Sequence, residues 1–459
     1  VTRLLASLLI LSAVSEHTAA RPNDSTPVAP VRCDWMPIGA RCEIERRESG
    51  AEKTVFTRLL NPPAADMTRV SFIGSVLPEG VVIRVTSAVT TESAEMDAAA
   101  LSRWNGYSPL FNGDKLLIEV ISRPPHADGL VVLATVASIS DGHTPNTGLQ
   151  LRDLCGTDDR IRDNTTAVAR LNTGGGRCTA SLIMTGEHMV SAGHCGPLGA
   201  TALVEFDPPD STSGGFTVAA PPERQFPFVI GSELRDNDFT YRTCGINQCV
   251  DNYGDDALVF RVAANTSGQL PGIARAGYMR ITRASPSFIV FLRKWGCGVN
   301  IPESGTSNLT MKRIDVGAVT PSNLDGGHYW TYSQDTTGGD SGGPMIWTSV
   351  NASIGVTSVS AFGDCPSASY SFESPSFTAL VESAVSAATT RFVDGASINV
   401  SGLAAGTVWN PQQSFRPAYD VVPTSGRVIV APGSYLTNNG VLSRPCTVAA
   451  PFGGVTLTR

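Results

Sequence analysis

Short apolar runs separated by turn residues dominate the first third of the chain. Val81–Val85, Leu116–Ile121 and Leu130–Val136 are rich in β-branched and aliphatic residues, as strands are. Only residues 94–101 have a helix-like pattern in this part. We therefore predict a compact, β-sandwich-like domain within residues 21–150, which carries no recognisable chemistry and suits a folding-assistance or binding module.

A similar pattern continues over residues 151–394, after a Gly- and Pro-bearing break at 141–148. A helix-like pattern appears chiefly at residues 378–392. Many short strands with one terminal helix predict a double β-barrel. The strand-like runs include Ala202–Phe206, Ala257–Val262, Phe288–Leu292 and Ile354–Val359.

The tail, residues 395–459, has short apolar runs at Arg427–Val430, Cys446–Ala449 and Val455–Leu457, spaced by Gly/Pro turns. Two interpretations stay open: one or two coils of a parallel β-helix, or an irregular β extension. So few coils cannot bury a core alone, so the tail either packs on another domain or belongs to a longer array.

Composition narrows the class of protein. The 459 residues suggest two or three domains, and 42% hydrophobic residues exclude global disorder. The net charge of −7 argues against a nucleic-acid partner, and no apolar run is long enough to span a membrane. No paired CxxC motifs are present, so we expect no metal and no cofactor.

The N-terminal residues 1–20 have the pattern of a secretory signal peptide. Arg3 precedes an apolar run over residues 4–14, and residues 18–20 are small, which favours cleavage after Ala20. The ten cysteines agree with export, because an even number in an exported chain indicates disulfides. We therefore expect a secreted protein.

Two motifs carry the candidate chemistry: Met189-Val-Ser-Ala-Gly-His-Cys195 and Gly338-Gly-Asp-Ser-Gly-Gly-Pro-Met345. A serine nucleophile needs a base within hydrogen-bond reach, and donors that face the developing oxyanion. The glycine-rich turn lets the backbone N–H groups of Gly339 and Ser341 face one point. Together the motifs predict nucleophilic catalysis by Ser341 with His194 as the base.

These motifs resemble the His and Ser signatures of the chymotrypsin-like (trypsin-fold) serine endopeptidases, over about residues 151–393. Further segments at 155–160, 164–166, 178–183 and 332–339 are similar to the secreted glutamyl endopeptidase branch. The resemblance implies a trypsin-like double β-barrel with the site in the cleft between barrels. It also implies His194 as general base, Ser341 as nucleophile and a disulfide between Cys178 and Cys195.

The acid of the catalytic triad has two candidates. In the family it lies in a pattern Asp-x-Ala-Leu-hydrophobic, which Asp255-Asp256-Ala257-Leu258-Val259 fits with Asp255 in the role. Strand alternation sends Asp255 and Ala257 to one face and Asp256 to the other. We assign Asp255, and Asp256 stays the alternative because the Asp-Asp pair leaves the register open.

The other cysteines and the charge next to Ser341 need partners. We favour the disulfides Cys33–Cys42, Cys244–Cys249 and Cys297–Cys365, which leaves Cys155–Cys446. Asp340 should have a buried cationic partner, because a lone charge beside the nucleophile turn is costly. The chain lacks the Arg-Ile-Val-Gly-Gly site that supplies this cation in many relatives, so we expect Arg293 or Lys294 instead.

Four residues are candidates for the specificity pocket: Asp335, Thr336, Thr357 and Ser358. An Asp six residues before the nucleophile selects Lys or Arg in trypsin. The glutamyl branch also has this Asp without that preference, and recognises Glu through a Thr, matched by Thr336, and a His, where this chain has Thr357. Basic specificity therefore competes with a small or apolar pocket in which Asp335 braces the turn, and a Glu preference is less supported.

The sequence as a whole predicts a secreted serine endopeptidase that hydrolyses protein or peptide substrates through an acyl-enzyme. It would be made as a precursor (zymogen), with residues 21–150 as a candidate pro-region. The alternative is a catalytically inactive protease-fold protein with a binding or adhesion role. A lipase-type hydrolase is excluded, because its triad needs a His after the nucleophile and none follows Ser341.

Overall fold

The computed structural model describes the chain in fifteen stretches, and the statements below concern these alone: residues 29–30, 32–62, 65–140, 159–212, 217–238, 240–244, 247–252, 254–284, 290–298, 312–322, 329–332, 335–359, 367–398, 400–437 and 442–458. The expected signal peptide at residues 1–20 and the expected domain boundary at residue 150 lie outside them.

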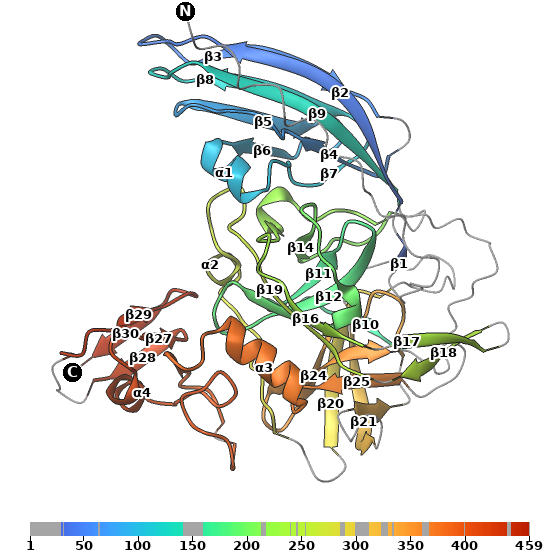
Figure 1. The fold of residues 1–459 in the computed structure, drawn as a ribbon, viewed down its shortest axis with the longest axis vertical. Helices are drawn as coiled ribbons and strands as arrows, with labels where there is room; N and C mark the ends of the chain where they lie inside the picture. The colour runs from blue at the N-terminus through green and yellow to red at the C-terminus, as the bar shows by residue number, and fades with distance from the viewer. Residues whose placement is uncertain are drawn as a thin grey trace, which may run out of the picture.

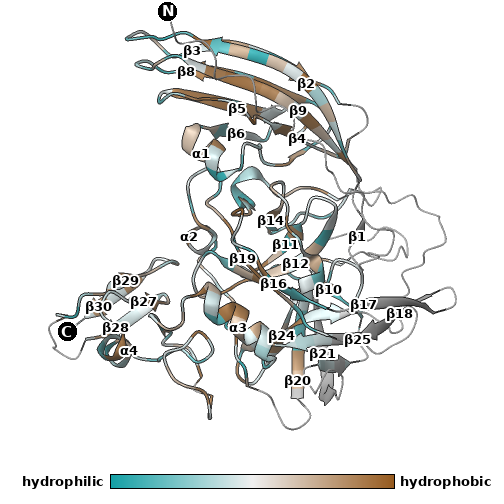
Figure 2. Ribbon diagram, in the orientation of Figure 1, coloured by the Kyte–Doolittle hydropathy of each residue, from teal (hydrophilic) through white to brown (hydrophobic). Residues whose placement is uncertain are grey.

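Two four-stranded antiparallel sheets form the N-terminal domain, at the top of Figure 1. Their inner faces share one buried cluster that includes Ile83, Trp104 and Ile118. Along a strand, successive side chains point to opposite faces of the sheet, so the inward-facing apolar residues supply this cluster (Figure 2). The sheets are β2 (Arg32–Ile44), β9 (Gly129–Ser140), β4 (Met67–Ser71) and β7 (Phe111–Asn112), and β3 (Lys53–Leu60), β8 (Leu116–Ser122), β5 (Val81–Ser87) and β6 (Ser93–Met96).

A second, eight-stranded antiparallel sheet follows and carries the His194 motif. Its order is β15 (Gln225–Pro227), β14 (Leu203–Phe206), β11 (Val168–Asn172), β12 (Gly176–Leu182), β13 (His188–Ser191), β19 (Asp256–Arg261) and β16 (Leu234–Asn237), with β1 (Ala29–Pro30) paired to β12. Strands β17 (Thr240–Cys244) and β18 (Asn247–Asn252) form a separate hairpin.

A seven-stranded antiparallel sheet carries the Ser341 motif. Its order is β10 (Ile161–Arg162), β21 (Lys312–Ser322), β20 (Val290–Gly296), β23 (Pro344–Trp347), β24 (Ala352–Val359), β25 (Ser367–Ser371) and β22 (Tyr329–Tyr332). The first and last strands of this group are both tied to β21, so the sheet curls on itself.

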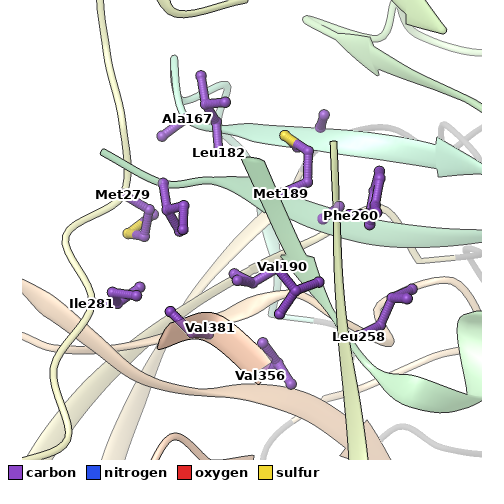
Figure 3. Close-up of a cluster of buried hydrophobic side chains, with 14 of the residues drawn as sticks. Ala167, Leu182, Met189, Val190, Leu258, Phe260, Met279, Ile281, Val356 and Val381 are labelled. Carbon is purple, nitrogen blue, oxygen red and sulfur yellow. The ribbon is translucent and has the colours of Figure 1, made fainter. Parts of the chain in front are cut away.

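One buried cluster joins these two sheets. Val190 of β13, Leu258 of β19 and Val356 of β24 gather with Val381 of the helix α3 (Pro375–Ala384) in Figure 3. His194 follows β13 and Asp256 begins β19, so this packing supports two of the three candidate catalytic residues. This apolar packing excludes water from the base of both motifs. Polar groups buried there must therefore be paired, because burying an unpaired polar group costs free energy.

The tail stacks short strands in parallel, as coils of a β-helix do. β26 (Thr390–Val393), β27 (Arg427–Val430) and β29 (Thr447–Ala449) form one sheet, and β28 (Gly433–Leu436) and β30 (Val455–Thr458) another. The helix α4 (Phe415–Val421) covers their buried cluster. The tail also packs on the rest of the chain: the centroids of the Phe452 and Tyr278 rings lie 4.7 Å apart.

The mainly β class is confirmed, with two antiparallel sheets where the pattern predicts a double β-barrel. The helix expected at residues 378–392 is shorter, because the chain leaves α3 near Ala384 and enters β26. The other helical elements are α1 (Ala98–Arg103), α2 (Pro271–Arg275), η1 (Gly193–Cys195) and η2 (Pro222–Arg224). In the described residues no helix has the length and apolar character needed to cross a bilayer.

Candidate active site

His194 lies in the single turn η1, which follows β13, and its side chain is almost fully buried. The glycine before it is required by packing. A Cβ on Gly193 would lie 2.7 Å from the backbone nitrogen of Ala257 and would collide with the carbonyl oxygen of Asp236. Gly193 therefore lets η1 rest directly on β16 and on β19, the strand that begins with Asp256.

Asp256, rather than Asp255, is the acid that contacts His194. Its carboxylate accepts the backbone N–H of His194 at 2.8 Å and lies 3.0 and 3.2 Å from the ring Nδ1. The Ser358 hydroxyl also donates to it. Asp256 is fully buried as the first residue of β19.

The assignment of Asp255 is thus corrected. Strand alternation does place the two carboxylates on opposite faces, but the face toward η1 is that of Asp256. The Asp255 carboxylate instead accepts hydrogen bonds from the hydroxyls of Tyr370 and Ser374. This pairing anchors the start of β19 to β25 and to the turn before α3.

Electrostatics favour an ionised Asp256. Burial alone would raise the pKa of its carboxyl, but His194 and the hydrogen bonds from His194 and Ser358 hold the pKa below its usual range. A buried carboxylate in this state fixes Nδ1 of His194 as the protonated ring nitrogen. Nε2 is then the nitrogen that can accept a proton.

The turn around the candidate nucleophile Ser341, called the nucleophile turn below, is held by its own backbone and by β24. Asp340 donates to the carbonyl of Thr337, and Gly343 donates to that of Asp340, both at 2.9 Å. Gly342 donates to Thr357 at 2.7 Å. Gly342 has φ +83°, and a side chain there would collide with Ser191 and Thr179, so only glycine fits.

The same turn leaves two donors available. Among the described residues, the backbone N–H groups of Gly339 and Ser341 have no hydrogen-bond acceptor, whereas those of Asp340, Gly342 and Gly343 do. Gly339 has φ +102°, a conformation that favours glycine. These are the two N–H groups that the motif predicts for an oxyanion.

Two strands tie this turn to the His–Asp pair. On β12, the Thr179 N–H donates to the Ser341 carbonyl at 2.7 Å, and the Thr179 hydroxyl donates to Gly339 at 2.8 Å. On β24, Thr357 exchanges backbone hydrogen bonds with the turn while Ser358 donates to Asp256. The three candidate catalytic residues are therefore positioned by a shared network.

Asp340 has two buried cationic partners, which confirms the expected pairing. Lys294 Nζ lies 3.4 Å and Arg160 Nη1 lies 3.1 Å from its Oδ2. Burial would raise the pKa of Asp340, but Lys294 and Arg160 lower it below its usual range. Of the two expected cations, Arg293 lies over the Trp295 ring instead.

Different partners hold the four residues expected at the specificity pocket. The Asp335 carboxylate is buried and accepts the Asp159 N–H at 3.0 Å. The Thr336 hydroxyl accepts from Lys294 Nζ at 2.5 Å. Thr357 is buried, and its hydroxyl has no hydrogen-bond partner in the described part of the chain. The Ser358 hydroxyl donates to Asp256.

One expected disulfide is present and another is not. Cys178 and Cys195 are bonded, with Cα atoms 6.2 Å apart, which ties β12 to η1. Cys33 and Cys42 are unbonded, because both lie on the one extended strand β2, where nine residues span roughly 30 Å. The side chains of Cys244 and Cys249, and both Cys155 and Cys365, lie outside the described residues.

Within the described stretches, the only group of side chains close enough to share a metal ion is Cys178, His194 and Cys195. The disulfide removes both thiolates, so this group cannot act as a metal site.

Sequence reasoning missed Arg160 and the contact of Ser358 with Asp256. Arg160 lies 180 residues before its partner Asp340, and no local pattern marks such a pair. The sequence places Ser358 at the specificity pocket, and its contact with Asp256, 102 residues away, depends on the tertiary packing of β24 and β19.

No family model matches the chain, and neither does any curated protein sequence. Among solved structures, a Glu endopeptidase in complex with MPD is 17% identical, covers 50% of this chain and 98% of its own, and has a TM-score of 0.35. Neuropsin, a serine protease expressed in the limbic system of mouse brain, is 14% identical with 50% and 100% coverage and a TM-score of 0.36. A protein named HBP is 15% identical, with 50% and 97% coverage and a TM-score of 0.36. The chain is thus similar to these structures over about half of its length.

Proposed function

We propose that the protein is a serine endopeptidase that uses Ser341, His194 and Asp256. The observation that carries the proposal is the buried Asp256–His194 pair, held by the same strands that hold the Ser341 turn. Burying two polar side chains so completely costs free energy unless their polar atoms are hydrogen-bonded. The hydrogen-bond network that this pair shares with the Ser341 turn, and the two backbone donors of that turn, support acyl transfer.

In the proposed reaction, Ser341 Oγ attacks the carbonyl carbon of a peptide bond while Nε2 of His194 takes its proton. The Asp256 carboxylate stabilises the resulting imidazolium and keeps Nδ1 protonated. The N–H groups of Gly339 and Ser341 donate to the oxyanion. His194 then protonates the leaving amine. In deacylation, Nε2 of His194 takes a proton from water, which attacks the acyl carbon, and His194 returns the proton to Ser341 Oγ as the ester bond breaks and the carboxylic acid leaves.

Protein or peptide substrates and a secreted location belong to the same proposal. The Cys178–Cys195 disulfide supports an oxidising compartment, because such bonds persist chiefly outside the cytosol.

A fluorophosphonate probe tests the function directly. The wild-type chain should be labelled at Ser341 and should hydrolyse a peptide library. Ser341→Ala should lose the label and at least about a thousandfold of the turnover. Ser102→Ala, which removes an exposed hydroxyl on α1, should retain both. Absence of labelling in the folded wild-type protein would instead favour the inactive binding protein.

A further inference from the structure

The N-terminal domain shares its core with the sheet that carries His194. Leu203 of β14 and Ala219 are both fully buried and belong to the domain's own hydrophobic cluster. Figure 1 shows the loops around α1 and β7 resting on the β14 end of this sheet. Separation of the two parts would therefore expose apolar surface on both.

Reciprocal amide contacts cross the same surface. The side chain of Gln225 accepts the Leu110 N–H and donates to the Leu110 carbonyl, both at 2.8 Å. In the opposite sense, Asn112 accepts the Ala219 N–H at 2.7 Å and donates to the Ala219 carbonyl at 3.1 Å. Each pair satisfies a buried peptide group completely, so the contact is directional and specific.

Two further side chains of the domain extend across the surface. Arg69 is buried over the Tyr107 ring and donates to the Thr201 carbonyl at 2.5 Å. Asn105 donates to the carbonyls of Ala200 and Phe228 at 3.2 and 2.9 Å. Asn105 has φ +56°, so its turn is shaped to present this amide.

The contacts lie at one edge of the sheet, and the candidate catalytic residues lie toward the other. The domain meets β14, β15, the loops around them and Arg177 near the start of β12, whereas His194 follows β13 and Asp256 begins β19. The docking surface is therefore suited to permanent attachment.

We propose that residues 32–140 are a permanently docked structural domain, which stays bound to residues 159–458 even when the chain between them is cut. The partner that fits the surface formed by Leu203, Ala219 and Gln225 is this domain. This differs from a pro-region that is released on maturation. The proposal does not rest on peptidase activity.

The experiment uses the full chain with a recognition sequence for a site-specific protease inserted within residues 141–158. Ser341→Ala is included so that self-cleavage cannot interfere. After cutting, the two parts should co-elute in size-exclusion chromatography at about 1 μM and separate only in denaturant. Separation of the parts in native buffer at this concentration would overturn the proposal.

A variant set tests the contacts themselves. Gln225→Glu removes the two N–H donors of the Gln225 side chain. Asn105→Gly removes the Asn105 side-chain amide, and glycine tolerates the positive φ at that position. Together they should raise the dissociation constant of the cut protein by about tenfold or more. Gln269→Glu, at an exposed amide in the loop between β19 and α2, should leave the dissociation constant unchanged. Equal dissociation constants in the double variant and in this control would contradict the proposed docking contacts.

Discussion

Which aspartate meets His194, and so which is the acid of the proposed triad, depends on a single residue step at the start of β19. Asp255 and Asp256 are chemically identical neighbours, and their roles differ only in the face to which each carboxylate points. Asp256 turns into the interior toward His194, and Asp255 meets the hydroxyls of Tyr370 and Ser374. The two positions form a matched pair for mutation.

Asp256→Asn should lower kcat by about a thousandfold to ten-thousandfold with little change in KM, because the amide cannot keep His194 in the productive tautomer. Asp255→Asn should keep kcat within a few-fold of wild type. Steady-state kinetics on one peptide substrate measures both. A larger loss of kcat in Asp255→Asn than in Asp256→Asn would refute the assignment.

Charge balance at the base of the nucleophile turn bears on substrate preference. Lys294 and Arg160 both pair with the carboxylate of Asp340, and Lys294 Nζ also donates to the backbone carbonyl of Asp335 at 3.0 Å. Two buried cations thus already lie at the base of this turn before any substrate binds. A pocket next to it has little need of a cationic substrate side chain.

We expect cleavage after small or apolar residues, and expect Asp335→Ser to leave that preference unchanged while it lowers stability. A peptide library with every residue type before the scissile bond measures this on both proteins. Dominant cleavage after Lys or Arg that collapses in Asp335→Ser would establish basic specificity instead. Dominant cleavage after Glu would show that Thr357 replaces the missing His.

At the scale of structural elements, the nucleophile turn is held to β20 by charge. Asp340 on the turn pairs with Lys294 on β20, and with Arg160 just before β10. Both positive charges come from a lysine and an arginine side chain. The turn therefore does not need a new N-terminal amine to neutralise Asp340.

Asp340→Asn should lower the thermal midpoint at pH 7, because it leaves two buried cations without their carboxylate. The folded-state pKa of Asp340 is lowered, so its contribution is present above the unfolded pKa of about 3.9 and is lost as pH falls through the folded value. The difference between wild type and variant should therefore shrink below about pH 4.

Thermal unfolding from pH 7 to pH 2 measures this difference. Asp210→Asn, at a largely exposed ion pair with Arg162, provides the control and should show little effect at any pH. A gap between wild type and Asp340→Asn that stays constant, or widens, toward pH 2 would contradict the ion cluster.

At the scale of the whole molecule, the tail is part of the packed structure. Phe452 is buried, belongs to the same cluster as the site's supporting strands, and contacts the Tyr278 ring. Pro451 lies against Gly186 and Gly272, where a side chain would collide with it. The coils thus bury their surface against the neighbouring sheet, as so few coils require.

Phe452→Ala should reduce the free energy of unfolding by about 3–5 kcal/mol, since it removes a buried aromatic ring and leaves a cavity. Val448→Ala in the same tail should cost far less, because Val448 is 41% exposed. Denaturant titration of both variants gives the comparison. Equal losses would mean that the tail is not packed as described.

Local patterns were sufficient for much of the fold. The β-branched runs at 81–85 and 427–430 became β5 and β27, because alternation and strand propensity act over neighbouring residues. The helix before β26 was overestimated, because an Ala-rich apolar stretch fits a buried helix and a buried strand equally well. The parallel pairing in the tail distinguished coils from an irregular extension.

The sequence by itself determined the mainly β class and the two motifs around His194 and Ser341. Their glycines are needed for local backbone shape and close approach, which a short motif can record. Only the tertiary structure decided that Asp256 meets His194, that Arg160 and Lys294 neutralise Asp340, and that Cys33 and Cys42 stay apart. These outcomes depend on strand register and on contacts between residues far apart in the chain, and neither leaves a signal in local composition or spacing.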